Sequence, residues 1–204
     1  MARRPTETLE RFWTMLAHNQ GCILNASRFA ASLSITSPTI TKYIDLLVDL
    51  LLVRRLVPFS TNIGKRLVKS PKIYVRDSGV VHALLGIANY NELSGHPIIG
   101  NSFEGFVIEN ILSILPERTR ISFYRTSAGS EIDLLLEMPN NKGLWAVEVK
   151  LSSSAKPTKG FYLAVNDLKP DKAFVVYLGN LSYFLDSQIE VIPLYKIIER
   201  IKNP

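Results

Sequence analysis

Apolar residues in the first part of the chain recur at the spacing of amphipathic helices. Four of them follow the i, i+3, i+4, i+7 pattern and predict a first helix: Leu9, Phe12, Trp13 and Leu16. Gly21 is expected to end this helix. Asn25 is a favourable N-cap and predicts a second, shorter helix that runs to Leu33.

A third helix is predicted at Ser37-Pro38, with Ser37 as the N-cap and Pro38 in the first helical position. Its buried stripe is expected to contain Ile40, Ile44, Leu47 and Leu51. A short helix, a tight turn and a longer helix form a helix-turn-helix. In such motifs the first turns of the last helix reach bases or phosphates, so the candidates for nucleic-acid contact are Thr39, Thr41, Lys42 and Tyr43.

Two strands are predicted next, at residues 53–57 and 72–76, because both segments are rich in β-branched and aromatic residues. The loop between them carries Lys65, Arg66 and Lys69. A hairpin with a basic tip after a helix-turn-helix is typical of a winged helix, and the tip would contact the phosphate backbone. A winged helix that binds another protein instead is the alternative.

The remaining pattern predicts a mixed central sheet flanked by helices. The expected order is a helix at 77–85, an irregular junction at 87–100, a helix at 101–115, strands at 121–125, 131–137 and 144–151, a helix at 158–168, a buried strand at 173–178, an edge strand at 189–193 and a helix at 194–201. The fold class is therefore α+β or α/β, with a winged-helix domain at 1–86 and a second domain at 101–204.

Charge is distributed unevenly along the 204 residues, whose net charge is +6. Residues 1–77 carry 12 Lys or Arg and 5 Asp or Glu, whereas residues 78–204 carry 12 and 13. A basic first third favours contact with a polyanion, nucleic acid first, although a merely soluble basic surface is the simpler alternative.

Several classes of protein are disfavoured by the composition. The single cysteine, Cys22, cannot form an internal disulfide, and with three histidines it cannot build the usual zinc site. No apolar run has the length of a membrane span and no signal peptide is recognisable, so a cytoplasmic location is expected.

Two acids and a lysine in the predicted second hairpin are the main candidates for chemistry. If the turn centres between Asn140 and Asn141, residue i faces residue 281 − i, so Asp133 lies opposite Glu148 and Lys150 shares the face of Glu148. Two adjacent carboxylates repel each other unless a cation lies between them, and such oxygen ligands suit Mg²⁺ or Mn²⁺. The alternative is a solvent-facing hairpin in which Glu148 and Lys150 simply form an ion pair.

Glu104 is a third candidate acid, on the predicted helix at 101–115. Asn101 as N-cap with Glu104 three residues later forms a variant of the capping box, which is a purely structural explanation. Glu104 also shares a helix face with Val107, Ile108 and Ile111, so it points towards the core side.

These acids occur in the order Glu104, Glu131-Ile132-Asp133 and Glu148-Val149-Lys150. This order resembles that of the PD-(D/E)XK nucleases, in which an acidic helix residue precedes an Asp and a (D/E)-X-K strand. The stretch Gly129-Ser130-Glu131-Ile132-Asp133 is also similar to archaeal Holliday-junction resolvases. The resemblance implies a restriction-endonuclease-like domain with Asp133, Glu148 and Glu104 as metal ligands and Lys150 beside the attacking water.

The segment from Leu9 to Leu178 resembles the C-terminal region of a family of prokaryotic AAA-like ATPases. In that family a Lys-Ser-Pro-Lys wing strand, here Lys69-Ser70-Pro71-Lys72, precedes an uncharacterised nuclease-like domain. The resemblance implies an ATPase partner in cis or in trans. No G-x-x-x-x-G-K-[ST] motif occurs, so no ATP site is expected here, and the chain is expected to be a fragment of a longer protein or a standalone remnant.

Two functions remain open at this point. The first is a phosphodiesterase that depends on Mg²⁺ or Mn²⁺, acts on DNA and uses Arg125 to hold a phosphate. The second is a non-catalytic module of an AAA-type ATPase that binds DNA or a protein.

Overall fold

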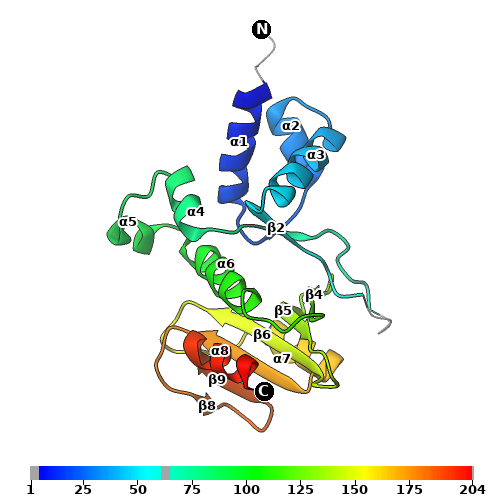
Figure 1. The fold of residues 1–204 in the computed structure, drawn as a ribbon, viewed down its shortest axis with the longest axis vertical. Coiled ribbons are helices and arrows are strands. Elements are labelled where there is room, and N and C mark those ends of the chain that lie inside the picture. The colour runs from blue at the N-terminus through cyan, green and yellow to red at the C-terminus, as the bar shows by residue number, and fades with distance from the viewer. Residues whose placement is uncertain (1–4, 61–64, 204) are drawn as a thin grey trace. The chain divides into compact units, whose positions relative to one another are not determined.

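The computed structural model describes residues 5–60 and 65–203. In these ranges it contains eight helices and two sheets (Figure 1). The chain forms two compact units, one of Met1–Leu56 with Ser70–Phe106 and one of Val57–Lys69 with Val107–Pro204. This division differs from the predicted one, because the predicted wing loop packs with the second unit.

The three predicted N-terminal helices are present in the first unit as α1 (Pro5–His18), α2 (Ala26–Leu33) and α3 (Ser37–Asp49). Asn25 caps α2 as predicted, since its side chain accepts the Arg28 N–H at 3.0 Å. The N-cap of α3 is Thr36, not Ser37, so the prediction was one residue late. Figure 1 shows α1, α2 and α3 grouped together, and their apolar faces share one core with β2.

Leu51 does not belong to the buried stripe of α3. The helix ends at Asp49, and Leu51 follows with a left-handed φ of 59° and 70% of its surface exposed. Ile40, Ile44 and Leu47 are buried as expected. Sequence spacing alone extended the stripe one turn beyond the point at which the backbone leaves the helix.

A small antiparallel sheet completes the predicted hairpin. Its strands are β1 (Cys22–Ile23), β2 (Val53–Leu56) and β3 (Lys72–Val75), in the order β1-β3-β2. Val53 pairs with Val75, which confirms the pairing of the two predicted strands, whereas β1 was not predicted.

The segment that follows is more helical than predicted. After α4 (Ser78–Leu84), capped by Asp77, the expected irregular junction contains α5 (Tyr90–Gly95). Helix α6 (Ile99–Leu112) begins before Asn101, so the predicted capping box was wrong. The Asn101 side chain instead donates to the Gln20 carbonyl at 2.7 Å.

The second unit contains a six-stranded mixed sheet with the order β4-β5-β6-β7-β9-β8. The strands are β4 (Arg120–Arg125), β5 (Glu131–Glu137), β6 (Leu144–Lys150), β7 (Lys172–Tyr177), β8 (Tyr183–Phe184) and β9 (Ile189–Pro193). Strands β6, β7 and β9 are parallel, and the other pairs are antiparallel. The unit also contains α7 (Lys159–Leu168) and α8 (Leu194–Lys202).

Strand β9 is not the edge strand that the sequence predicted. It lies between β7 and β8, and all five of its residues are buried. The edge is β8, a two-residue strand with exposed side chains that gave no recognisable pattern. The expected burial of β7 is confirmed for Ala173 to Tyr177, whereas Leu178, predicted as the last buried residue, follows the strand and is 53% exposed.

Residues 57–60 and 65–69 lie along β4. Phe59 donates its N–H to the Phe123 carbonyl at 2.7 Å, and Val68 donates to the Arg125 carbonyl at 3.0 Å. Residues 61–64, part of the predicted wing tip, lie outside the described residues. These two stretches therefore cover the outer edge of the larger sheet, which would otherwise present unpaired backbone groups.

No helix in the described ranges is both long and apolar enough to span a bilayer.

Candidate functional site

The candidate site begins where the pairing of β5 and β6 ends. The four residue pairs between these strands, from Glu137↔Leu144 to Leu134↔Val147, all follow the predicted rule that residue i faces residue 281 − i. Asn140 and Asn141 form the turn with left-handed φ values of 59° and 57°, which asparagine tolerates better than most residues. The predicted register of the hairpin is confirmed over these pairs.

A β-bulge interrupts β5 at Asp133. Between Ser122↔Leu135 and Tyr124↔Ile132, three residues of β5 advance against two of β4. A bulge bends its strand and redirects side chains. Ile132 and Leu135, which a regular strand would place on opposite faces, consequently belong to the same apolar cluster.

Beyond the last backbone pair of β5 and β6, the side chain of Asp133 forms the next hydrogen bond between the two strands. Its Oδ2 accepts the N–H of Val149 at 3.0 Å. This bond places the carboxylate beside the residue that follows Glu148. The two acids are close enough for the charge of Asp133 to contribute to raising the pKa of Glu148.

Glu148 is a buried acid with two kinds of partner. Its side chain is 5% exposed, and Lys150 Nζ lies 2.6 Å from its Oε1. The N–H of Thr158 lies 3.2 and 3.3 Å from its two oxygens. Burial is the largest influence and raises the pKa of Glu148, while the contacts with Lys150 and Thr158 oppose that rise.

Thr158 is positioned by the start of α7. Its hydroxyl accepts the N–H of Phe161 at 3.1 Å and so caps the helix. Gly160 lets this end of α7 approach the turn before β5, since a Cβ there would lie 2.5 Å from the Gly129 carbonyl oxygen. Thr158 was predicted to start this helix, but its role at the site was missed, because sequence spacing does not show which amide a distant carboxylate reaches.

Asp133 and Glu148 are hard oxygen donors of the kind that Mg²⁺ and Mn²⁺ prefer, and Lys150 adds a cation beside them. These residues fit a divalent ion bound by two carboxylates that completes its shell with water. Within residues 5–60 and 65–203, no three His, Cys, Asp or Glu side chains gather closely enough to hold a metal ion.

Glu104 contacts Tyr74 and Lys72 within the first unit. Its Oε1 accepts from the Tyr74 hydroxyl at 2.6 Å and lies 3.3 Å from Lys72 Nζ. The Lys72 side chain is only 4% exposed. These contacts give Glu104 a structural explanation that differs from both the predicted capping box and the predicted metal ligand.

The candidate nucleic-acid residues of α3 differ in their availability. Thr41 donates to the Ser37 carbonyl at 3.3 Å, and the Thr39 and Thr36 hydroxyls are 2.9 Å apart. Lys42 is exposed, whereas Tyr43 is half-buried and packs against Phe12.

Two of the four candidate cations in the second unit, Lys65 and Arg125, lie within ion-pair distance of carboxylates. Lys65 forms an ion pair with Asp167 of α7, which also accepts from the Tyr124 hydroxyl at 3.2 Å. Burial and the nearby Asp167 raise the pKa of Tyr124 above its usual range. Arg125 lies 3.5 Å from Glu131 across β4 and β5. Arg66 and Lys69 are exposed.

The structure thus defines a two-unit α/β protein with an acid–lysine cluster on its larger sheet. Residues 1–91 match the family model "Domain of unknown function (DUF8612)", and residues 99–197 match "Domain of unknown function (DUF4143)". The chain is similar to uncharacterized proteins of Mycobacterium bovis and Mycobacterium tuberculosis, with 36% identity to each over 96% of this chain and 44% of the relative. It therefore spans less than half the length of these relatives. No solved structure matches the chain.

Proposed function

We propose that the second unit hydrolyses phosphodiester bonds of DNA with the help of Mg²⁺ or Mn²⁺. The observation that carries this proposal is the convergence of Asp133, Glu148 and Lys150 where the pairing of β5 and β6 ends. The order of these residues also resembles that of PD-(D/E)XK nucleases, and a restriction-endonuclease-like fold is part of the proposal.

In this proposal Asp133 and Glu148 hold the ion. A divalent ion there lowers the pKa of a bound water and stabilises charge on a phosphoryl oxygen. Lys150 has a separate part, because its ammonium can orient the attacking water or neutralise negative charge that develops on the phosphate. Glu148 must be deprotonated to bind the ion, and Lys150 and Thr158 favour that state. A role for Glu104 as a further ligand stays a prediction.

In this proposal both units contribute to DNA affinity. Lys42 of α3, in a first unit that we interpret as a winged helix, and the exposed Arg66 and Lys69 of the second unit contact phosphates. DUF4143 domains commonly occur with AAA-like ATPases, so we assign the ATPase partner, in cis or in trans, to the same proposal. A cytoplasmic location of the protein is also part of this proposal.

The test is nicking of supercoiled and branched DNA in Mn²⁺ by the full chain and by Asp133→Ala. Glu137→Gln is the matched control, because Glu137 lies at the other end of β5, next to the turn. We expect nicking by the parent chain and by the control, and none by Asp133→Ala. Nicking that survives Asp133→Ala unchanged would reject the assignment, provided that thermal unfolding shows all three proteins folded.

A second candidate is a non-catalytic docking module, which the surface of α3 favours. Leu46 of α3, its C-cap Leu50 and the following Leu51 are all exposed. An apolar strip suits a protein partner better than phosphate. If Leu46→Ser abolishes association with the ATPase module of a relative while Mn²⁺ binding and nicking are undetectable, this candidate replaces the first.

A further inference from the structure

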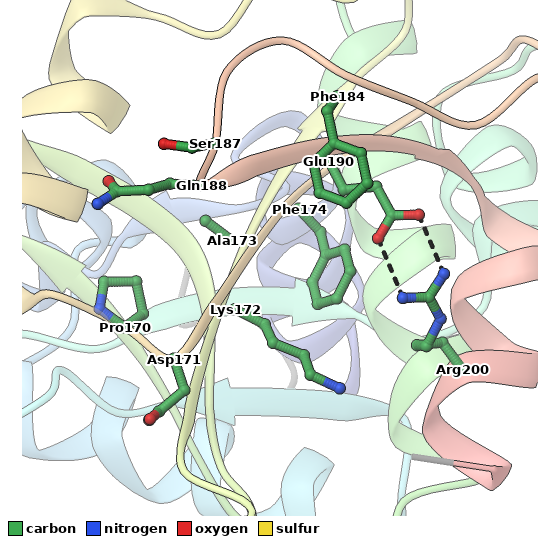
Figure 2. Close-up of a pocket in the computed structure, with 10 residues that line it drawn as sticks. All are labelled: Pro170, Asp171, Lys172, Ala173, Phe174, Phe184, Ser187, Gln188, Glu190 and Arg200. Atoms are coloured by element: carbon green, nitrogen blue, oxygen red, sulfur yellow. Dashed lines mark hydrogen bonds and ion pairs between the residues drawn. The ribbon is translucent and has the colours of Figure 1, made fainter.

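A pocket of about 340 Å³ lies in the second unit, away from the acid–lysine cluster. It is lined by residues of β7, β8, β9 and α8 and of the loops beside them (Figure 2). Lys172 is the first residue of β7 and Glu190 the second of β9, so the pocket lies at the amino ends of these parallel strands. Glu148 and Lys150, by contrast, lie at the carboxyl end of β6.

The pocket also lies on the other face of the sheet. Val175, the register partner of Glu148, packs in one cluster with Phe161 and Ala164 of α7. Phe174 neighbours Val175 in the strand and therefore points to the opposite face. Its register partner is Glu190, which contacts Arg200 of α8. The pocket is thus separate from the proposed metal site.

The polar groups of the pocket are held in fixed positions. Glu190, whose side chain is 7% exposed, accepts from two nitrogens of Arg200 at 3.1 and 3.2 Å. Figure 2 shows this two-bond pair beside the rings of Phe174 and Phe184. A guanidinium held in this way keeps its remaining N–H groups in a defined direction, from which they can bind an anion.

Lys172 supplies a second cation. Its Nζ lies 4.4 Å from the ring centroid of Trp145, and an ammonium over a ring keeps its charge while it loses freedom to move. The acid next to it in the chain, Asp171, is turned to the backbone, since its Oδ2 accepts the Leu144 N–H at 2.7 Å. Asp171 keeps its charge in this contact and Arg200 is paired with Glu190, so the pocket offers an anion the Lys172 ammonium and the remaining N–H groups of Arg200, not a net positive charge.

The aromatic wall gives the pocket its second feature. Phe174 is buried at its base, whereas Phe184 on the edge strand β8 is 65% exposed. A large exposed ring beside the Lys172 ammonium and the positioned N–H groups of Arg200 fits a ligand that combines a flat aromatic ring with a negative charge. Bases stack on such rings in proteins that bind single strands, and their phosphates take Lys and Arg partners.

We propose that this pocket binds one nucleotide, with the base against Phe184 and the phosphate at Lys172 and Arg200. Gln188 and Ser187 line the same pocket and offer hydrogen bonds to the base edge. The nucleotide is either a free mononucleotide or one residue of a single strand, since both present the same chemistry. This binding needs no metal ion and does not depend on the proposed hydrolysis.

The test is calorimetric binding of adenosine 5′-monophosphate and of a short oligodeoxyadenylate to the full chain in EDTA. The variants are Phe184→Ala and Lys172→Gln, and the matched controls are Tyr90→Ala, an exposed aromatic of the first unit, and Lys202→Gln on α8. We expect each pocket variant to weaken binding about tenfold or more, the controls to leave it unchanged, and adenosine to bind more weakly than its monophosphate.

The two probes separate the sources of the nucleotide. Tighter binding of the oligonucleotide, with the same losses in both pocket variants, assigns the pocket to a strand, and binding of the monophosphate alone assigns it to a free nucleotide. The proposal is overturned if neither probe binds in the millimolar range, or if the pocket variants bind as the parent chain does. Asp133→Ala must bind as the parent chain does, so failure of the proposed hydrolysis leaves this result readable.

Discussion

Lys150 Nζ lies 2.6 Å from Glu148 Oε1. Although this lysine favours the ionised form of Glu148, burial outweighs it and raises the pKa of the carboxyl group. The raised pKa of Glu148 means that the folded protein holds its proton to a higher pH than the unfolded chain does. The free energy of unfolding should therefore fall as the pH rises from the usual glutamate range through the folded pKa.

Glu148→Gln should remove that part of the pH dependence, because the amide does not titrate. The measurement is urea unfolding of the parent chain and of Glu148→Gln over a series of pH values. Glu137→Gln, at the other end of the hairpin, serves as the control and should keep the slope of the parent chain. An unchanged slope in Glu148→Gln would show that another group titrates in this interval.

The approach of α7 to the turn before β5 predicts the effect of a single methyl group. In Gly160→Ala the new Cβ would meet the Gly129 carbonyl oxygen at 2.5 Å, so the start of the helix must shift. We expect a loss of about 1–3 kcal/mol in the free energy of unfolding, together with weaker Mn²⁺ binding, because Thr158 moves away from Glu148.

Gly100→Ala is the matched control for that substitution. Gly100 also lies in the first turn of a helix, but nothing lies within 4 Å of its added Cβ. Its stability should stay the same or rise by less than about 1 kcal/mol. Denaturant unfolding and calorimetry with Mn²⁺ check both variants, and equal effects of the two would refute a specific contact at Gly160.

The contacts of Glu104 predict a non-additive pair of substitutions. Glu104→Ala leaves the buried Lys72 ammonium without this carboxylate and should cost about 2–4 kcal/mol. Lys72→Met combined with Glu104→Leu should recover most of that loss, because an apolar pair can replace a buried ion pair. A double-mutant cycle by urea unfolding measures the coupling. Additive losses would show that the two residues act separately.

Sequence patterns predicted the elements near the candidate site well where local signals were strong. The hairpin register followed from its asparagine turn, and the caps Asn25 and Asp77 were recognisable because short polar side chains precede apolar runs. The predictions for Leu51 and for the capping box at Asn101 were wrong because apolar spacing does not show where a helix begins or ends: α3 stops at Asp49, and α6 begins at Ile99.

The parts of the candidate site that sequence could not supply depend on long-range geometry. The bulge at Asp133 depends on the neighbouring strand β4, and the bond from Thr158 to Glu148 depends on how α7 crosses the sheet. The packing of the segment 57–69 along β4 was missed for the same reason, since its basic residues matched the wing of a winged helix equally well.

The pairing of Lys65 with Asp167 predicts that the basic residues of this segment contribute unequally to DNA binding. Arg66→Ala and Lys69→Ala should each lower the slope of log K against log salt concentration by about 1, as expected for one lost phosphate contact. Lys65→Ala should change the slope less, because its ammonium already has a carboxylate partner.

Fluorescence anisotropy with a labelled duplex at several salt concentrations measures the slopes. Lys202→Ala, on α8, is the control for a general loss of charge. If Lys65→Ala lowers the slope as much as Lys69→Ala does, the ion pair with Asp167 opens on binding, and the segment contacts DNA through all three cations.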